Sequence, residues 1–144
     1  MAGDLKVVCP QCGAANRIDS ARLGDRPKCG RCKQLLFNSY PLELSNENFD
    51  RNISANEIPV VVEFWAPWCG YCKRMAPIFD QAAAQLEPRV RFAKVNTEAE
   101  PSISGRFGVQ GVPTTIIFKN GREIARQSGA MDLPTLLRWI SSFA

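Results

Sequence analysis

The chain has 144 residues, of which 45% are apolar, and carries a formal net charge of +4. This length allows one compact domain of ordinary size with a small additional module, but not two full domains. No stretch approaches the roughly 18 apolar residues of a membrane-spanning helix, and the segment up to Val8 lacks the apolar core and cleavage site of a secretory signal. We therefore expect a cytoplasmic protein with no membrane partner.

The six cysteines indicate metal binding or redox catalysis, because structural disulfides are rare in a reducing compartment. Four of them lie in residues 1–38, which also carry seven basic and three acidic side chains. Four thiolates around one divalent zinc ion would halve this positive excess, and Phe37 is the only aromatic residue there that could stack on a base. The charge of this segment therefore does not favour nucleic acid as a partner.

A change in composition at residues 38–41 divides the chain into two parts. The part before it is rich in cysteine and poor in apolar side chains, whereas strand-like and helix-like patterns alternate in the part after it. We therefore expect a four-cysteine module over residues 1–38 and a larger domain over residues 39–144.

The alternating patterns of the larger domain predict nine elements. In chain order these are a strand over residues 41–44, a helix over 45–53, a strand over 58–66, a helix over 69–86, a strand over 90–95, a short helix over 103–107, a hairpin of strands over 114–118 and 123–126 around an Asn120-Gly121 turn, and a helix over 132–143. Ser45 and Asp132 are the expected caps of the first and last helices, and Pro77 predicts a kink in the second. Residues 58–66 are almost all apolar, many of them β-branched, which is typical of a strand buried on both faces. The order predicts an α/β fold in which a mixed central sheet is covered by helices on both faces.

The segment Trp68-Cys69-Gly70-Tyr71-Cys72 directly follows the buried strand and opens a helix. The unpaired N–H groups and positive dipole end of a helix N-terminus favour a thiolate, so Cys69 is expected to be the nucleophile with the low pKa. Residues three apart on a helix share a face, so Cys72 can resolve a mixed disulfide formed at Cys69. The alternatives are half of a zinc site or an inert buried pair. The strand-then-helix context favours a redox-active disulfide between Cys69 and Cys72.

Two further Cys-x-x-Cys motifs lie in the N-terminal module, sixteen residues apart: Cys9-Pro10-Gln11-Cys12 and Cys29-Gly30-Arg31-Cys32. This spacing is typical of a zinc ribbon, so we expect one zinc ion per chain, bound by all four cysteines. Gly13 and Gly30 are expected to relax the two turns so that backbone N–H groups approach the thiolates. The alternatives are two disulfides or a second redox pair, which we disfavour because we expect no strand before either motif. The sequence leaves open whether the zinc is purely structural or is released on oxidation.

Several motifs of the larger domain resemble those of thioredoxins. They are the active-site segment from Val62 to Lys73, a proline at Pro77 inside the second helix, the third strand from Phe92 to Asn96, the cis-proline loop from Gly111 to Thr114 and the hairpin from Phe118 to Gly121. This resemblance covers about residues 40–144. With its N-terminal cysteines, the whole chain is similar to the zinc-containing bacterial thioredoxin 2 subfamily. The resemblance implies a thioredoxin fold preceded by a small zinc-ribbon module.

The resemblance also implies an activity and partners. The chain would be a protein-disulfide reductase that acts on disulfide-containing proteins and is recharged by an NADPH-linked thioredoxin reductase. An alternative of another class is an oxidation-sensing zinc protein that binds client proteins in the manner of a holdase once zinc is lost. A third is a scaffold or nucleic-acid module with a passive domain, against which the intact Cys69 and Cys72 argue.

Further site residues follow from the resemblance alone. Glu63 stands where the family has a buried aspartate, and would serve Cys72 as a general base; the alternative is an acid that reaches solvent at the sheet margin. Lys94 resembles a lysine that the family has near this acid; the alternative is an ordinary lysine on a strand. The bond before Pro113 would be cis. The residues expected to bind substrate are Trp68, Gly70, Tyr71, Gly111, Val112 and Pro113.

Tyr71 departs from the family, which usually has proline at this position. Unlike proline, tyrosine has a backbone N–H in the first helical turn. We expect this donor to lie near the Cys69 sulfur, to favour its thiolate and so to make the pair more oxidising than is usual in the family. The alternative is that Tyr71 is simply tolerated on an exposed turn and has no effect on the redox potential.

Overall fold

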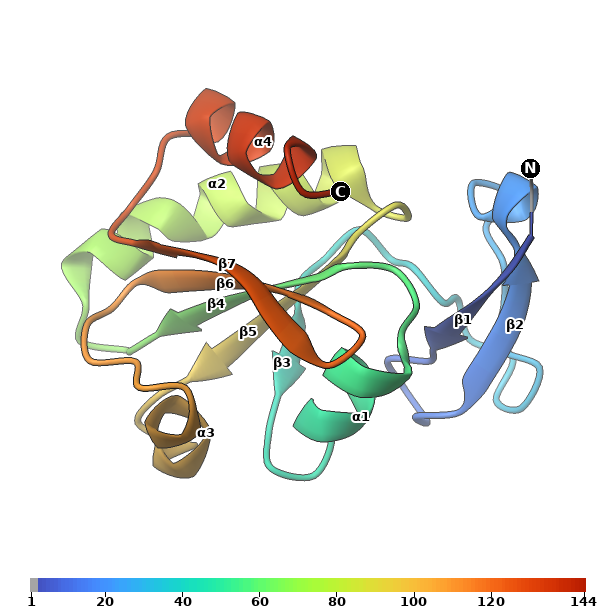
Figure 1. The fold of residues 1–144 in the computed structure, drawn as a ribbon, viewed down its shortest axis with the longest axis horizontal. Coiled ribbons are helices and arrows are strands. Elements are labelled where there is room, and N and C mark those ends of the chain that lie inside the picture. The colour runs from blue at the N-terminus through green and yellow to red at the C-terminus, as the bar shows by residue number, and fades with distance from the viewer. Residues whose placement is uncertain (1–2) are drawn as a thin grey trace.

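The computed structural model describes residues 3–144, which form a two-stranded antiparallel sheet and a five-stranded mixed sheet (Figure 1). The strands are β1 (Asp4–Val8), β2 (Ala15–Asp19), β3 (Leu42–Leu44), β4 (Val60–Trp65), β5 (Arg91–Asn96), β6 (Thr114–Lys119) and β7 (Arg122–Ser128). The helices are η1 (Ser20–Arg22), α1 (Phe49–Ala55), α2 (Gly70–Leu86), α3 (Pro101–Arg106) and α4 (Leu133–Ser141). No helix among residues 3–144 is both long enough and apolar enough to span a membrane.

The larger sheet has the strand order β3-β5-β4-β6-β7. β4 is central: it pairs in parallel with β5 and antiparallel with β6. All of its residues except Trp65 are buried, because both faces of the strand are covered. This confirms the prediction of a central strand from the almost continuous apolar run.

Helices cover both faces of this sheet, as Figure 1 shows, with α2 and α4 on one side and α1 and α3 on the other. α2 and α4 bury Phe79 and Ile140 against one face, and α1 and α3 bury Phe49 and Ile103 against the other. The predicted order of strands and helices and the two-sided arrangement are confirmed. The predicted caps are confirmed only in part, because Asp132 accepts the Thr135 N–H at 2.9 Å but the first helix starts elsewhere.

The first helix begins at Phe49, not directly after Ser45 as predicted. The carbonyl of Ser45 accepts the backbone N–H of Phe49 at 2.9 Å, and its hydroxyl accepts that of Glu47 at 3.2 Å. Asn48 closes this turn by accepting the Ser45 N–H through Oδ1 at 2.7 Å. Residues 45–48 therefore form a separate turn, closed by the bond between Ser45 and Asn48, and the helix begins only after it.

The N-terminal module differs from expectation in having a strand, β1, that ends directly before Cys9. No strand was expected there. β1 pairs with β2 in an antiparallel hairpin. No helix begins at Cys9 or at Cys29, so neither motif has the strand-then-helix context of the pair in the larger domain.

The module packs against the larger domain through a fully buried arginine at the start of β5. Arg91 is 1% exposed, and its guanidinium donates to the carbonyl oxygens of Val8 at 3.1 Å and Leu36 at 2.8 Å. It also lies over the ring of Phe37 at 4.5 Å and within 3.9 Å of a Glu87 carboxylate oxygen. The module therefore has a fixed position on the sheet. Figure 1 shows β1 and β2 at one end of the long axis and the start of α2 at the other.

Candidate active site and metal centre

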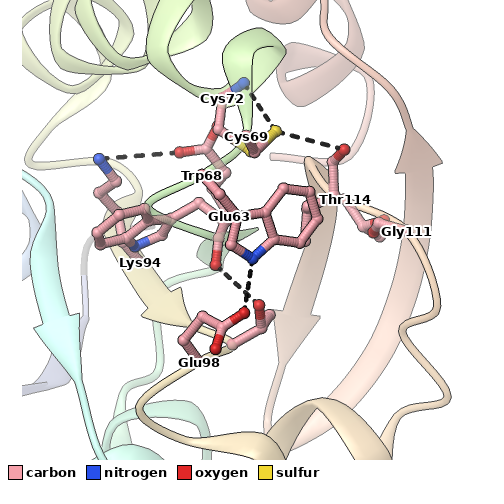
Figure 2. The surroundings of a disulfide bond; sticks show 11 residues. Glu63, Trp68, Cys69, Cys72, Lys94, Glu98, Gly111 and Thr114 are labelled. Atoms are coloured by element: carbon pink, nitrogen blue, oxygen red, sulfur yellow. Dashed lines mark hydrogen bonds and ion pairs between the residues drawn. A yellow bond between two sulfur atoms is a disulfide. The ribbon is translucent and has the colours of Figure 1, made fainter.

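Cys69 and Cys72 are joined by a disulfide at the start of α2, and each is only 4% exposed (Figure 2). Cys69 is the N-cap of the helix, and its Sγ accepts the backbone N–H of Cys72 at 3.1 Å. This sulfur therefore occupies the place where the end of the helix dipole favours a negative charge. In this disulfide form, the N–H that bonds to Cys69 Sγ is that of Cys72 and not that of Tyr71.

The loop before β6 lies directly beside Cys69. The Val112–Pro113 peptide bond is cis, as the resemblance implied. Cys69 Sγ is 3.6 Å from the Val112 carbonyl oxygen, and the Thr114 hydroxyl donates to the Gly111 carbonyl at 2.6 Å. The structure thus brings Gly111, Val112 and Pro113 together with the disulfide.

Two large aromatic side chains border the disulfide and are open to solvent. Trp68 is 68% exposed and Tyr71 62% exposed, and Gly70 between the cysteines is also exposed. The Trp68 indole N–H donates to a Glu98 carboxylate oxygen at 2.6 Å, as Figure 2 shows. Glu98 was not predicted, because it belongs to no motif. Its place just after β5, at the sheet edge where the redox pair lies, was the available signal.

Glu63 is completely buried in β4, so the alternative that it reaches solvent is wrong. Burial raises the pKa of this carboxyl to about 7, and the Lys94 ammonium, with Nζ 4.0 Å from Oε1, opposes part of that rise. Neither carboxylate oxygen has a hydrogen-bond partner within residues 3–144. Lys94 also lies over the ring of Trp65 at 5.2 Å. Glu63 therefore changes its protonation state near neutral pH.

A cavity of about 120 Å³ lies beside Cys72. Its lining is mostly apolar and includes Trp65 and Lys94 together with Cys72. Lys94 also approaches Glu63. Lys94 is therefore a shared neighbour of Cys72 and the buried acid.

The four remaining cysteines meet at one point of the N-terminal module. The Sγ atoms of Cys9, Cys12, Cys29 and Cys32 all lie within 4.8 Å of one another. Two of these separations, Cys9 to Cys32 and Cys12 to Cys29, are 3.6 Å. Tetrahedral zinc–thiolate bonds of about 2.3 Å place the sulfur atoms about 3.8 Å apart. The geometry and chemistry of this set therefore fit zinc.

The two Cys-x-x-Cys turns have the same backbone arrangement. In each turn the first sulfur accepts an N–H at 3.4 Å, from Gln11 in one and from Arg31 in the other. The residue after the second cysteine has a positive φ, which is 79° at Gly13 and 68° at Lys33. The expectation for Gly13 is thus confirmed, but in the second turn the left-handed residue is Lys33 and not Gly30. N–H groups that point at sulfur favour thiolate ligands.

The cysteine pair lies at the start of a helix and beside a cis-proline loop, and the strand before it carries a buried acid. This arrangement defines a thiol-disulfide oxidoreductase with a thioredoxin fold. A family model described as "Thioredoxin" matches residues 40–142. A zinc-ribbon model described as "Thioredoxin 2, N-terminal" matches residues 8–34. The chain belongs to the thioredoxin family, whose members exchange a dithiol for a disulfide in proteins.

Individual relatives agree with this assignment. The chain is 44% identical over 134 residues to "Thioredoxin C-3" of Corynebacterium nephridii, an alignment that covers 93% of this chain and 92% of that protein. It is 36% identical over 98 residues to "Thioredoxin 1" of Nostoc sp., covering 68% of this chain and 92% of that protein. The crystal structure of Malassezia sympodialis thioredoxin (Mala s 13) superposes with a TM-score of 0.64 at 31% identity, over 69% of this chain and 87% of that one.

Proposed function

We propose that Cys69 is the attacking thiol and Cys72 the resolving thiol of a protein-disulfide reductase. The observation that carries this assignment is the position of the two sulfurs. Cys69 caps α2 beside Val112 and the exposed Trp68, whereas Cys72 lies within the first turn. A substrate that docks on Val112 and Trp68 would therefore meet Cys69 first.

The exchange conserves electrons and protons between the two partners. The Cys69 thiolate attacks one sulfur of the substrate disulfide, forming a mixed disulfide and releasing the other sulfur as a thiolate that takes up a proton. Cys72 then loses its proton and attacks Cys69, which releases the second substrate thiol. The enzyme ends oxidised by two electrons and the substrate reduced by two. An NADPH-linked thioredoxin reductase would supply two further electrons and so reduce the Cys69–Cys72 disulfide again.

We propose that Glu63 accepts the proton that Cys72 loses. A pKa of about 7 lets the carboxylate accept a proton near neutral pH. Lys94 lies 4.0 Å from Glu63 Oε1 and lines the same cavity as Cys72, so the acid and the thiol share this neighbour. Glutamate stands here in place of the aspartate of the family.

Substrate would dock across the rim that surrounds Cys69. An extended segment would pair with the backbone of Val112, which precedes the cis proline Pro113. Trp68 and Tyr71 supply exposed apolar area next to the redox pair, and Gly70 and Gly111 leave room for the backbone of the substrate.

The N-terminal module would bind one zinc ion per chain through Cys9, Cys12, Cys29 and Cys32. Zinc bound there would supply a cross-link that reinforces the small apolar core of the module, which includes Val7, Leu23 and Leu36. We place the boundary so that the module spans residues 1–38 and the thioredoxin domain residues 39–144. Thiolate ligands and a dithiol enzyme both require reducing conditions, which supports a cytoplasmic location.

Trapping experiments test the two cysteine roles. Cys72→Ser should accumulate mixed disulfides with substrate proteins, because nothing resolves the bond at Cys69, and Cys69→Ser should accumulate none. Trapping by Cys69→Ser alone would reverse the assignment. Reduction of insulin with NADPH and a thioredoxin reductase measures the overall activity, which both variants should lose.

Metal analysis tests the zinc assignment. The Cys69→Ser, Cys72→Ser double variant should retain one zinc ion per chain, whereas Cys9→Ser should lose it. Zinc loss from the double variant would mean that the redox thiols are ligands.

A further inference from the structure

The loop after β5 holds a negative charge at the rim of the redox site. Glu98 is exposed, and its Oε1 accepts the Trp68 indole N–H at 2.6 Å. Its own backbone N–H donates to Asn96 Oδ1 at 3.0 Å, and the neighbouring Thr97 is fixed to β4 by its N–H bond to the Trp65 carbonyl at 2.8 Å. The carboxylate is therefore held in place by its loop as well as by Trp68.

Holding Trp68 does not require this charge, because an indole N–H is satisfied by any neutral acceptor. Within residues 3–144, no lysine or arginine forms an ion pair with Glu98. One carboxylate oxygen is used by the indole, and the exposed carboxylate retains its capacity for a second partner. An unpaired charge fixed beside a substrate-docking tryptophan is available to a substrate.

Basic side chains lie at the start of α2. Lys73 and Arg74 lie in the first turns of α2 and are exposed, and the Arg74 guanidinium lies over the Tyr71 ring at 5.3 Å. Figure 2 shows Glu98 on the far side of the Trp68 indole from the start of α2. Glu98 therefore puts a negative charge on a rim that is basic at the start of α2.

We propose that Glu98 is a specificity residue that pairs with a lysine or arginine of the substrate protein next to the disulfide being reduced. This rests on the proposed docking of substrate across Trp68 and Val112. The pair forms at the surface, where a complementary charge acts mainly on the rate of encounter and on the choice between substrates. Its effect weakens as salt is added, because the Debye length is only about 8 Å at 0.15 M ionic strength.

The test uses disulfide-linked dimers of a short peptide in three versions, in which lysine, glutamine or glutamate flanks the single cysteine. The reduced full-length protein with its zinc is mixed with each peptide, and the reaction is stopped with acid and quantified by chromatography. At low ionic strength the wild-type protein should reduce the lysine peptide about fivefold faster than the glutamate peptide, the upper range for exposed ion pairs. High salt should bring this ratio close to one.

Glu98→Gln keeps an acceptor for the Trp68 indole while it removes the charge, so it should lower the lysine-to-glutamate ratio at least about threefold. Glu47→Gln removes an exposed carboxylate from the loop before α1 and should leave the ratio as in the wild-type protein. Glu98→Ala removes both the charge and the acceptor. It should show the same loss of preference, together with a changed Trp68 fluorescence.

The outcomes separate this proposal from the proposed function. An unchanged ratio in Glu98→Gln would overturn the specificity role, as would an equal slowing of all three peptides, which would make Glu98 a positioning residue for Trp68. If the wild-type protein reduces the lysine and glutamate peptides at equal rates and also reduces the glutamine peptide, only the role of Glu98 is overturned. Failure of the wild-type protein to reduce the glutamine peptide would instead contradict the proposed function.

Discussion

At the scale of single residues, Glu63 has a consequence for stability that can be measured. Because burial raises the pKa of Glu63 from 4.5 to about 7, the native state keeps a proton in this range that the unfolded state has lost. The free energy of unfolding therefore falls as the pH rises from about 4.5 to about 7. Glu63→Gln lacks this dependence. Its stability relative to wild type should increase by about 2 kcal/mol between about pH 5 and about pH 8.

Urea unfolding of the oxidised proteins at several pH values measures this difference. Glu47→Gln serves as the control, because it makes the same chemical change on the surface. A stability difference between Glu63→Gln and wild type that does not vary with pH would contradict the argument.

At the scale of elements, the hairpin of β6 and β7 depends on one glycine. Gly121 has φ +81°, and a Cβ at this position would lie 3.2 Å from Ser54 Oγ of α1. Its N–H also donates to the Ile53 carbonyl at 2.9 Å, so the turn cannot move without losing a contact with α1. Gly121→Ala should lower the free energy of unfolding by about 1 to 2 kcal/mol, because alanine is strained at positive φ.

Gly105→Ala is the matched control for this change. Gly105 lies inside α3, and an added Cβ there would meet nothing within 4 Å. Alanine should therefore stabilise the protein by about 0.5 to 1 kcal/mol, since it loses less entropy than glycine in a helix. Denaturant unfolding of both variants checks the two signs, and a loss of stability in Gly105→Ala would contradict the role given to backbone conformation.

Elements that local sequence determines were predicted well, and those that depend on distant contacts were not. The apolar run of β4 and the Asn120-Gly121 turn are local signals, and the structure has both. β1 was missed because its five residues form a strand only by pairing with β2. The start of α1 was misplaced because Ser45 can cap a helix or begin a turn, and its bonds to Asn48 favour the turn.

The same distinction applies to the site. Cys69, Cys72 and the four zinc ligands have motifs with fixed spacing, so the sequence predicts their grouping. Glu98 reaches Trp68 from 30 positions away in the chain through a single side-chain bond. No spacing rule describes such a contact, which follows from the parallel pairing of β4 and β5.

At the scale of the whole molecule, Arg91 joins the zinc-ribbon module to the larger domain. Its guanidinium satisfies carbonyl oxygens that precede Cys9 and follow Cys32 along the chain, at Val8 and Leu36. Arg91→Ala leaves these acceptors unpaired in a buried interface and isolates Glu87, so the free energy of unfolding should fall by about 3 kcal/mol. Arg89→Ala, an exposed change two residues earlier, should have little effect.

Unfolding of these two variants is best followed by trypsin digestion of the native proteins together with denaturant titration. Arg91→Ala should expose the module to cleavage while the larger domain stays resistant, because the fully buried contact between them is lost. Equal resistance of both variants would show that the other contacts of the module suffice to hold it.

The β1–β2 hairpin and the start of α2 lie at opposite ends of the long axis (Figure 1), which has a practical consequence for surface attachment. Lys28 and Lys33 are exposed on the zinc-ribbon module, far from the start of α2. A bead or electrode coupled to these amines would hold the molecule by one end and orient the Cys69–Cys72 disulfide toward the liquid. A layer of molecules anchored in this way would present its redox sites to dissolved proteins in a uniform orientation.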